Sequence, residues 1–316
     1  MKYKVFVDGQ EGTTGLKINE RLSRRADIDI LKIDPERRKD PEVRCIFLNE
    51  ADIAFLCLPD VASRESAALV TNNKTRIIDA STAHRTDPNW TYGIPELSKN
   101  QRARIRDSRR VSVPGCHATG FNMAIYPLIQ EGIVPKDYPI TCQSITGYSG
   151  GGKKLIEKYE ETGVNKKNLK SPRFYALNLT HKHLPEMQKI NGLLFPPLFT
   201  PIVGDFYQGM VVAVPLLTRL LNKKISAKDV QEVLASYYSS EHFVSVMPYE
   251  SEDCLDSGYL DATGCNNTNR IEIFIFGNGE QILLLSRLDN LGKGASGAAI
   301  QNMNIMLGLD ERTGLG

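Results

Sequence analysis

The sequence predicts an α/β protein with two domains: a parallel, doubly wound sheet comes first, and an α+β domain with a mostly antiparallel sheet follows. With 316 residues, 41% of them hydrophobic and 24% charged, the chain has the length and composition of a two-domain globular protein. Short apolar runs alternate with amphipathic segments in the first third of the chain, as in βαβ units. After residue 120, longer strand-like runs predominate.

The first domain is expected over residues 1–115 and contains five strand patterns. The strands are expected at 3–7, 28–33, 52–58, 75–80 and 109–113. Amphipathic segments such as 16–25 and 61–73 separate several of them. This order of elements is typical of a parallel sheet with helical crossovers.

The second domain is expected over residues 116–292. Its strands are expected at 139–146, 209–217, 242–247, 270–276 and 281–288. The last two are joined by Gly277-Asn278-Gly279-Glu280, whose Asn-Gly pair is a hairpin signal. Ser226 with Asp229 three residues later resembles a capping box that opens a helix. The final segment, 293–316, is expected to form a helix that packs back on the first domain.

Composition argues against several classes of protein. Thirty-nine basic and thirty-seven acidic residues give a net charge of +2, and the basic pairs are scattered, so no nucleic-acid partner is expected. No apolar run is long enough for a membrane span, and the start has no signal-peptide pattern, so we expect a cytoplasmic protein without a membrane partner. The six cysteines show neither CxxC nor His/Cys ligand spacing, so no metal site is expected.

A glycine-rich stretch, GQEGTTG at 9–15, follows the first strand and opens the first helix. Gly9, Gly12 and Gly15 suit a tight bend and a close backbone approach to a pyrophosphate, with Thr13 and Thr14 at the start of the helix. The loop predicts a Rossmann-type dinucleotide site. Its spacing is GxxGxxG, not the usual GxGxxG, and an ordinary strand-to-helix turn is the alternative interpretation.

The residues after the second strand bear on the choice of cofactor. Basic residues there accommodate the 2′-phosphate of NADP, whereas an acidic residue favours NAD. The sequence offers Asp34 but also Arg37 and Arg38. The two arginines favour NADP, and the alternative is that both are solvated loop charges.

Cys116, in PGCHATG at 114–120, follows a strand and precedes a helical pattern. A thiol at a helix N-terminus lies where the helix dipole stabilises the thiolate, which lowers the thiol's pKa and makes it nucleophilic. The same N–H groups suit an oxyanion formed by attack on a carbonyl. A buried structural cysteine is the alternative.

A cysteine nucleophile usually has a histidine within reach, and the chain has five candidates. His181 and His183 lie two residues apart, so in an extended segment both would face one pocket. His242 begins a strand pattern and is interpreted as structural. The loop TGYSGGGKK at 146–154 resembles a Walker loop, but Lys154 replaces the Ser or Thr that holds magnesium, which argues against an NTPase.

Several segments together resemble the N-acetyl-gamma-glutamyl-phosphate reductase family, which belongs to arginine biosynthesis. The resemblance spans nearly the whole chain in the right order, and the length and GDFYQGM at 204–210 are similar to the shorter of its two forms. It is carried by GQEGTTG, DASTAHR (79–85), YGIPEL (92–97), PGCHATG, GYSGGGK (147–153), HKHLPE (181–186) and NLGKGASGAAIQNMN (290–304).

The resemblance implies a semialdehyde dehydrogenase-like fold and the NADPH-dependent reduction of N-acetylglutamyl 5-phosphate to the 5-semialdehyde, with phosphate released. It implies Cys116 as nucleophile and His181 as the preferred acid/base, with His183 nearby. The family's usual tyrosine after the cysteine is His117 here, so the choice of base among the three histidines stays open. A thioester on the cysteine accepts the hydride.

Further site residues are assigned from these motifs. The substrate-binding candidates are Arg85, His117, Tyr148, Ser149, Tyr175 and Glu186. The candidates for cofactor contacts, beyond the glycine loop and the two arginines, are Ser81, Gly150 and Asn290. Arg85 and the 147–153 loop are expected to meet anionic groups of the substrate, and a structural ion pair is the alternative for Arg85.

Two other functions stay open at this point. One is reduction of a different acyl phosphate, as in aspartate-semialdehyde dehydrogenase. The other is a non-catalytic NADP-binding redox sensor with Cys116 as its sensing thiol. The resemblance also implies a homo-oligomer, a dimer or a tetramer.

Overall fold

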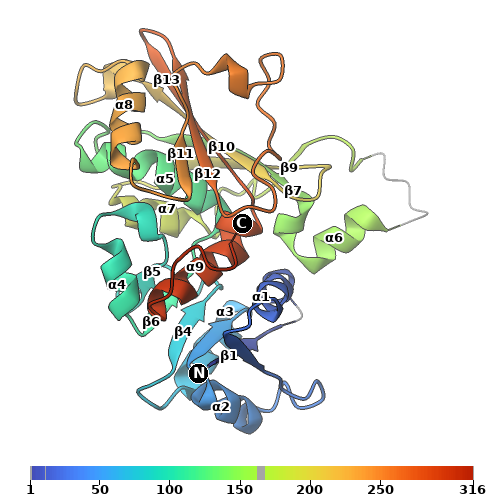
Figure 1. Cartoon of the computed structure of the whole chain (residues 1–316). Coiled ribbons are helices and arrows are strands. Elements are labelled where there is room, and N and C mark those ends of the chain that lie inside the picture. The colour runs from blue at the N-terminus through green and yellow to red at the C-terminus, as the bar shows by residue number, and fades with distance from the viewer. Residues whose placement is uncertain (1, 11, 162–167, 316) are drawn as a thin grey trace. The chain divides into compact units, whose positions relative to one another are not determined.

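The computed structural model describes residues 2–10, 12–161 and 168–315, so Glu11 of the glycine loop lies outside the described residues. The chain divides into two compact units. The first comprises Met1–Pro114 with Ala295–Gly316, and the second comprises Gly115–Gly294. Figure 1 shows the elements of each unit.

The first unit is built on a parallel sheet in the order β2-β1-β3-β4-β6-β5. Its strands are β1 (Tyr3–Asp8), β2 (Ile28–Leu31), β3 (Ile53–Leu56), β4 (Arg76–Asp79), β5 (Thr91–Tyr92) and β6 (Arg110–Ser112). The five expected strands are confirmed, and the two-residue β5 was not expected. The strand order reverses between β1 and β3, which is where such sheets bind ligands at their carboxyl edge.

The described residues of the first unit also form the helices α1 (Thr13–Ser23), α2 (Pro41–Glu50), α3 (Asp60–Leu69), α4 (Gln101–Asp107) and α9 (Gly297–Met306), with a 3₁₀ turn η1 (Pro95–Leu97). The α9 helix packs against α1, α4 and β4. It is shorter than the expected 293–316. A π-helical turn, η5 (Gly292–Ser296), precedes it, and turns follow Met306 as far as residue 315, since Gly308 adopts a left-handed φ of 71°.

The second unit contains a sheet in the order β11-β12-β13-β10-β7-β9-β8. Its strands are β7 (Thr141–Gly147), β8 (Arg173–Phe174), β9 (Leu198–Gly204), β10 (Met210–Leu217), β11 (Val244–Val246), β12 (Ile271–Gly277) and β13 (Gln281–Leu288). This sheet is mixed, because β7–β9 and β11–β12 are parallel while the other described pairs are antiparallel. The expectation of a mostly antiparallel sheet was therefore wrong.

The error has a local cause in β9. The strand contains Pro201 and follows Pro196 and Pro197, and prolines argue against a strand because they cannot donate to the ladder. In the structure the neighbouring β8 is only two residues long, so little pairing is lost on that side. The parallel β7–β9 pair is reached by a crossover that includes α6 (Lys153–Glu160) and α7 (Leu184–Asn191).

Two further helices cover one face of this sheet. The central helix α5 (Cys116–Gln130) packs against β10 and β13, and α8 (Ala227–Tyr237) packs against β12. The capping box expected at the start of α8 is confirmed, since the Ser226 hydroxyl accepts from the Asp229 N–H and the Asp229 carboxylate accepts from the Ser226 N–H. Short 3₁₀ turns lie at η2 (Tyr148–Gly151), η3 (Thr218–Leu220) and η4 (Glu252–Cys254).

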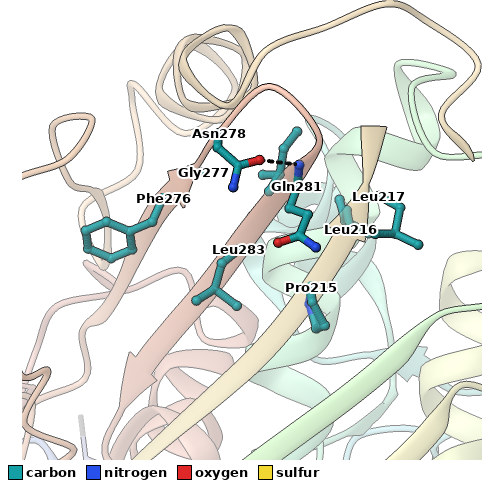
Figure 2. Close-up of a pocket in the computed structure, with 9 residues that line it drawn as sticks. Pro215, Leu216, Leu217, Phe276, Gly277, Asn278, Gln281 and Leu283 are labelled. Atoms are coloured by element: carbon teal, nitrogen blue, oxygen red, sulfur yellow. Dashed lines mark hydrogen bonds between the residues drawn. The ribbon is translucent and has the colours of Figure 1, made fainter. Parts of the chain in front are cut away.

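The expected hairpin joins β12 to β13, and an apolar pocket of about 340 Å³ lies beside it (Figure 2). The Asn278 side-chain oxygen accepts from the Gln281 backbone N–H at 3.0 Å, which closes the turn. The lining of the pocket includes Pro215, Phe276 and Leu283 and contains no ionisable side chain. The pocket therefore offers no group for acid, base or nucleophilic chemistry. Within the described parts of the chain, no helix is both long and apolar enough to span a membrane.

Candidate functional site

Cys116 is the first residue of α5, and its position is fixed from two sides. The backbone N–H of Gly115, the N-cap residue, donates to the Glu186 carboxylate at 2.8 Å. A Cβ atom added to Gly294 would lie 2.7 Å from the Cys116 Cβ, so the backbone of η5 approaches the cysteine closely. The half-buried thiol lies where the first N–H groups of the helix have no partner within the helix.

Three imidazoles gather at His117, the residue that follows Cys116 in α5. The ring centroid of His117 is 5.5 Å from that of His181 and 5.4 Å from that of His183, and the last two are 4.7 Å apart. Phe199 of β9 packs edge-on against His117 and His181. The pair 181 and 183 thus lies in one cluster, but the expected extended segment is wrong: these residues form the turn that leads into α7, and His183 has φ −88° and ψ −10°.

The ring of His181 is oriented by a hydrogen bond at one nitrogen, which leaves the other nitrogen for proton transfer. Its Nδ1 accepts from the backbone N–H of His183 at 3.1 Å, so the neutral ring carries its proton on Nε2. The side chain is partly exposed, whereas His117 and His183 are buried. Of the three rings, His181 is therefore the one that keeps access to solvent.

His117 joins two further polar side chains. Its Nδ1 lies 2.8 Å from the Ser144 hydroxyl, and its Nε2 lies 2.8 Å from the Tyr175 hydroxyl. Burial lowers the pKa of His117 to about 3, and the positive charges of His181 and Lys182 add to the effect. Burial raises the pKa of Tyr175, and negative charge on Cys116 raises it further. The pocket thus holds a neutral imidazole and a protonated phenol.

Other expected site residues of the second unit form hydrogen bonds and packing contacts with neighbouring residues of the same unit. Asn290 accepts from the Gly209 N–H and donates to the Ser149 hydroxyl at 3.0 Å. The N–H groups of Tyr148 and Ser149 donate to carbonyls of residues 206 and 207, so these two do not point toward an anion. The ring of Tyr148 stacks on Tyr159 of α6 with centroids 4.5 Å apart. Gly150 lies beside Asn290, where an added Cβ would be 3.5 Å from its amide nitrogen.

The three glycines of the loop in the first unit differ in how much space a side chain would have. Gly9 has φ +87°, and an added Cβ would lie 2.4 Å from the Cys57 carbonyl oxygen, so no other residue fits. Gly15 is required for the same reason, because its added Cβ would lie 2.4 Å from the Gly9 oxygen. At Gly12 an added Cβ would meet only ordinary contacts at 3.6 Å and beyond. The fold itself does not require that glycine.

The first turn of α1 fits the phosphates of a dinucleotide. Gly12 is its N-cap residue and supplies no side chain to satisfy the first N–H groups, while Thr13 and Thr14 follow at the start of the helix. This turn follows β1 at the point where the strand order reverses. The residues present therefore fit a nucleotide cofactor.

The two arginines after β2 differ in their surroundings. Arg37 forms an exposed ion pair with Asp40 at 2.9 Å, and Asp40 also caps α2 through the N–H groups of Glu42 and Val43. Arg38 is half-buried. Both belong to the loop between β2 and α2, and their expected contact with a 2′-phosphate stays a prediction.

A buried carboxylate, Asp79 at the end of β4, organises the segment that contains Ser81. It accepts from Ser63 at 2.7 Å, from Ser81 at 2.8 Å and from His84 Nδ1 at 2.6 Å. Burial acts to raise the pKa of Asp79, but the bond from His84 and those from the serines outweigh it, and the net pKa lies below the ordinary value. The His84 ring stacks on Trp90, with centroids 4.0 Å apart.

Arg85 is buried and its guanidinium donates to the carbonyls of Val113 and Ala80. A second carboxylate that the sequence did not single out, Asp8, accepts from Arg44 and Ser66 at 2.8 Å each. Asp8 ends β1 and Asp79 ends β4, and β3 lies between these two strands. The partners of Asp8 lie 36 and 58 residues further along the chain, so no local pattern predicts its contacts. Among the described residues, no group of three or more His, Cys, Asp or Glu side chains could hold a metal ion.

Two family models match the chain. Residues 5–105 match the NAD binding domain of semialdehyde dehydrogenases, and residues 116–290 match the dimerisation domain of the same enzymes. Solved structures show the same fold: aspartate semialdehyde dehydrogenase II of Vibrio cholerae has a TM-score of 0.71 at 15% identity, covering 97% of this chain and 99% of that one. The Candida albicans aspartate semialdehyde dehydrogenase, solved with NADP, has a TM-score of 0.62 at 15% identity and covers 97% and 99%.

Curated relatives are much closer in sequence. The N-acetyl-gamma-glutamyl-phosphate reductase 2 of Nostoc sp. is 48% identical, with 99% of both chains covered. Pseudomonas putida has a reductase 2 at 45% identity with 96% of each chain covered, and the Rhizobium meliloti reductase is 46% identical over 97% and 99%. With such identity over nearly its whole length, the chain belongs to the N-acetyl-gamma-glutamyl-phosphate reductase family.

Proposed function

We propose that this protein reduces N-acetylglutamyl 5-phosphate to N-acetylglutamate 5-semialdehyde, with release of phosphate, in arginine biosynthesis, and that NADPH is the reductant. The observation that carries the proposal is the half-buried thiol at the start of α5, directly before His117, whose imidazole clusters with those of two other histidines, in a chain of this family. The match to an NAD binding domain supports a nicotinamide cofactor, and Arg37 and Arg38 favour the 2′-phosphorylated form.

The second unit supplies the covalent chemistry. The Cys116 thiolate attacks the acyl carbon, the bond from carbon to the phosphate oxygen breaks, and a thioester remains on the sulfur. Bound NADPH would supply the hydride that the thioester carbon accepts. The alkoxide so formed becomes the aldehyde as its carbon–sulfur bond breaks, and protonated His181 gives its proton to the departing Cys116 sulfur. The free thiol and the aldehyde are the products.

Other residues are proposed for binding. The loop of Gly9, Gly12 and Gly15 with Thr13 and Thr14 would hold the pyrophosphate, since Gly12 leaves space that the fold does not need. The expected roles of Arg85, Ser81, Gly150 and Asn290 stay predictions, as do substrate contacts by Tyr148, Ser149, Tyr175 and Glu186. We assign residues 1–115 with 293–316 to cofactor binding and residues 116–292 to catalysis and dimerisation.

Replacement of Cys116 tests the covalent mechanism. In the reverse direction, with phosphate and the 5-semialdehyde, the protein should reduce NADP⁺, and Cys116→Ser should lose at least about a thousandfold of the rate. NADPH binding, measured by fluorescence titration, should be unchanged. Cys254→Ser, a half-buried cysteine on η4, is the matched control and should retain activity. Substantial turnover by Cys116→Ser would overturn the mechanism.

The same assay settles substrate and cofactor. Aspartate semialdehyde and NAD⁺ are compared with the acetylated semialdehyde and NADP⁺ at equal concentrations. We expect kcat/KM to favour the acetylated substrate with NADP⁺. Preference for aspartate semialdehyde would assign the protein to the alternative reductase, and preference for NAD⁺ would reject the role of the two arginines.

A further inference from the structure

The hydrogen-bonded series Ser144, His117 and Tyr175 runs through the buried side of the pocket. Ser144 lies on β7, His117 is the second residue of α5, and Tyr175 follows β8. The Ser144 hydroxyl and His117 Nδ1 are 2.8 Å apart, as are His117 Nε2 and the Tyr175 hydroxyl. Since His117 follows Cys116 directly in α5, the phenol oxygen is bonded to the neighbour of the nucleophile.

The available donors and acceptors determine which atom carries each proton in this series. The Ser144 hydroxyl is buried, and among the described residues His117 Nδ1 is its partner. A buried hydroxyl hydrogen without an acceptor is costly, so Ser144 donates and Nδ1 is the unprotonated nitrogen. A neutral imidazole then carries its proton on Nε2 and donates it to the Tyr175 oxygen. The phenol's own proton is left for another acceptor.

The surroundings keep His117 in this neutral form. Besides Ser144 and Tyr175, it faces Phe199 of β9 and the rings of His181 and His183, with the charge of Lys182 nearby. Burial, with smaller contributions from His181 and Lys182, lowers its pKa to about 3, so we expect no titration of the ring between pH 5 and 9. His117 therefore does not serve as the acid or base of the reaction at neutral pH.

We infer that Ser144 and His117 are positioning residues that fix the Tyr175 hydroxyl so that its proton is donated to the Cys116 thiolate. The Tyr175 oxygen is hydrogen-bonded to the residue that follows Cys116, and its own proton has no acceptor among the described residues, so that proton is available to the thiolate. A hydrogen bond to the thiolate lowers the pH at which the thiol ionises. The inference adds a device for activating the nucleophile and rests on the proposed function only for its effect on turnover.

The test measures how the alkylation rate of Cys116 by iodoacetamide depends on pH, without substrate. Peptide mass analysis separates Cys116 from the other five cysteines. Tyr175→Phe and His117→Phe should each move the half-maximal pH upward by about one unit, because a thiolate loses one hydrogen bond. The double variant should shift no further. His117→Gln, which keeps a neutral amide donor, should recover most of the wild-type profile.

Controls and a second measurement keep the test decisive. His242→Gln, on an exposed side chain, should leave the profile unchanged. His181, His183 and Lys182 are retained in every variant, so their charges do not account for a shift. The acid limb of the kcat/KM profile should move with the alkylation profile. A Tyr175→Phe profile equal to that of the wild type, or His117→Phe without a shift, overturns the inference.

If His117→Phe fails to fold, the wild-type protein still gives an answer. In nitrogen NMR of ¹⁵N-histidine protein, His117 should show a protonated Nε2 and an unprotonated Nδ1 from pH 5 to 9, with assignment by His117→Gln. A protonated Nδ1, or titration within that range, overturns the inference. Neither alkylation nor NMR needs the substrate, so an enzyme inactive with the 5-semialdehyde would reject the proposed function separately.

Discussion

At the scale of single residues, His181 and His183 are neighbours with different surroundings. His181 is partly exposed and its Nδ1 accepts the His183 backbone N–H, which orients the ring and leaves Nε2 for proton transfer. His183 is buried and is the N-cap residue of α7. The backbone bond that orients His181 does not depend on the side chain at 183.

Separate replacement of the two histidines distinguishes their roles. His181→Asn should lower kcat by about 100- to 10,000-fold, because general acid–base catalysis contributes that much. His183→Asn should lower it less, since its backbone N–H is retained. Rates are measured with the 5-semialdehyde, phosphate and NADP⁺. Loss of activity in His183→Asn alone would transfer the acid/base role to His183.

At the scale of elements, the π-helical turn η5 and the start of α5 form one packed unit. The Gly294 N–H donates to the Asp289 carbonyl, and the Asp289 carboxylate accepts from the Leu291 N–H at 2.8 Å. This holds the turn against Cys116, where no side chain fits at position 294. Insertion of a methyl group must displace either the turn or the cysteine.

Gly294→Ala should therefore act on the reaction more than on the fold. The added Cβ would lie 2.7 Å from the Cys116 Cβ, and a misplacement of about 1 Å can cost about a hundredfold in rate. Circular dichroism should be close to that of the wild type. The matched control is Gly279→Ala in the hairpin, where an added Cβ meets nothing within 4 Å. Equal activity of the two variants would contradict the tight packing at Cys116.

The sequence predicted elements best where the signal is local. Pro114 and Gly115 before a helical pattern placed Cys116 at the start of α5, and the glycine loop placed the first turn of α1. The prolines around β9 argued against a strand at this position, but pairing with β7 and β8 stabilises one. His181 and His183 were expected in one pocket, but the turn that brings their rings together depends on packing against Phe199 and is not visible in the spacing.

Contacts between distant residues were not predictable in the same way. Asp8 meets Arg44, 36 residues further along, and Ser66, 58 residues further along. The packing of α2 and α3 against the sheet brings these residues to the end of β1. The Ser144, His117 and Tyr175 series has the same origin, because it joins two strand segments and a helix through tertiary packing.

At the scale of the whole molecule, the Asp79 cluster ties β4 to α3 and to the loop that follows β4. The pKa of Asp79 is lower in the folded than in the unfolded protein, so the carboxylate contributes stability above about pH 4, and this is lost as pH falls further. Asp79→Asn should lower the free energy of unfolding at pH 7 by about 1–3 kcal/mol.

Urea unfolding at pH 7 and at pH 3.5 tests this prediction. The difference between Asp79→Asn and the wild type should shrink at the lower pH. Asp107→Asn is the control, because Asp107 is exposed and pairs with Arg106 at the surface, so the variant should unfold almost as the wild type does. If the difference in the free energy of unfolding between Asp79→Asn and the wild type grew at pH 3.5, the predicted direction of the Asp79 pKa shift would be contradicted.

The match of residues 116–290 to a dimerisation domain bears on assembly. We expect light scattering of the purified protein to give a mass of two or four chains at micromolar concentration. A single-chain mass that persists at the concentration used for activity would reject a homo-oligomer as the working form.

The fluorescence of Trp90, whose ring stacks on His84, can report on the unfolding of one unit of the protein. Trp90 is the single tryptophan of the chain, and it lies in the first unit. Its indole emission therefore follows melting of that unit alone, while tyrosine absorbance follows both. If the two halves come apart at different temperatures, the two signals will separate without any label.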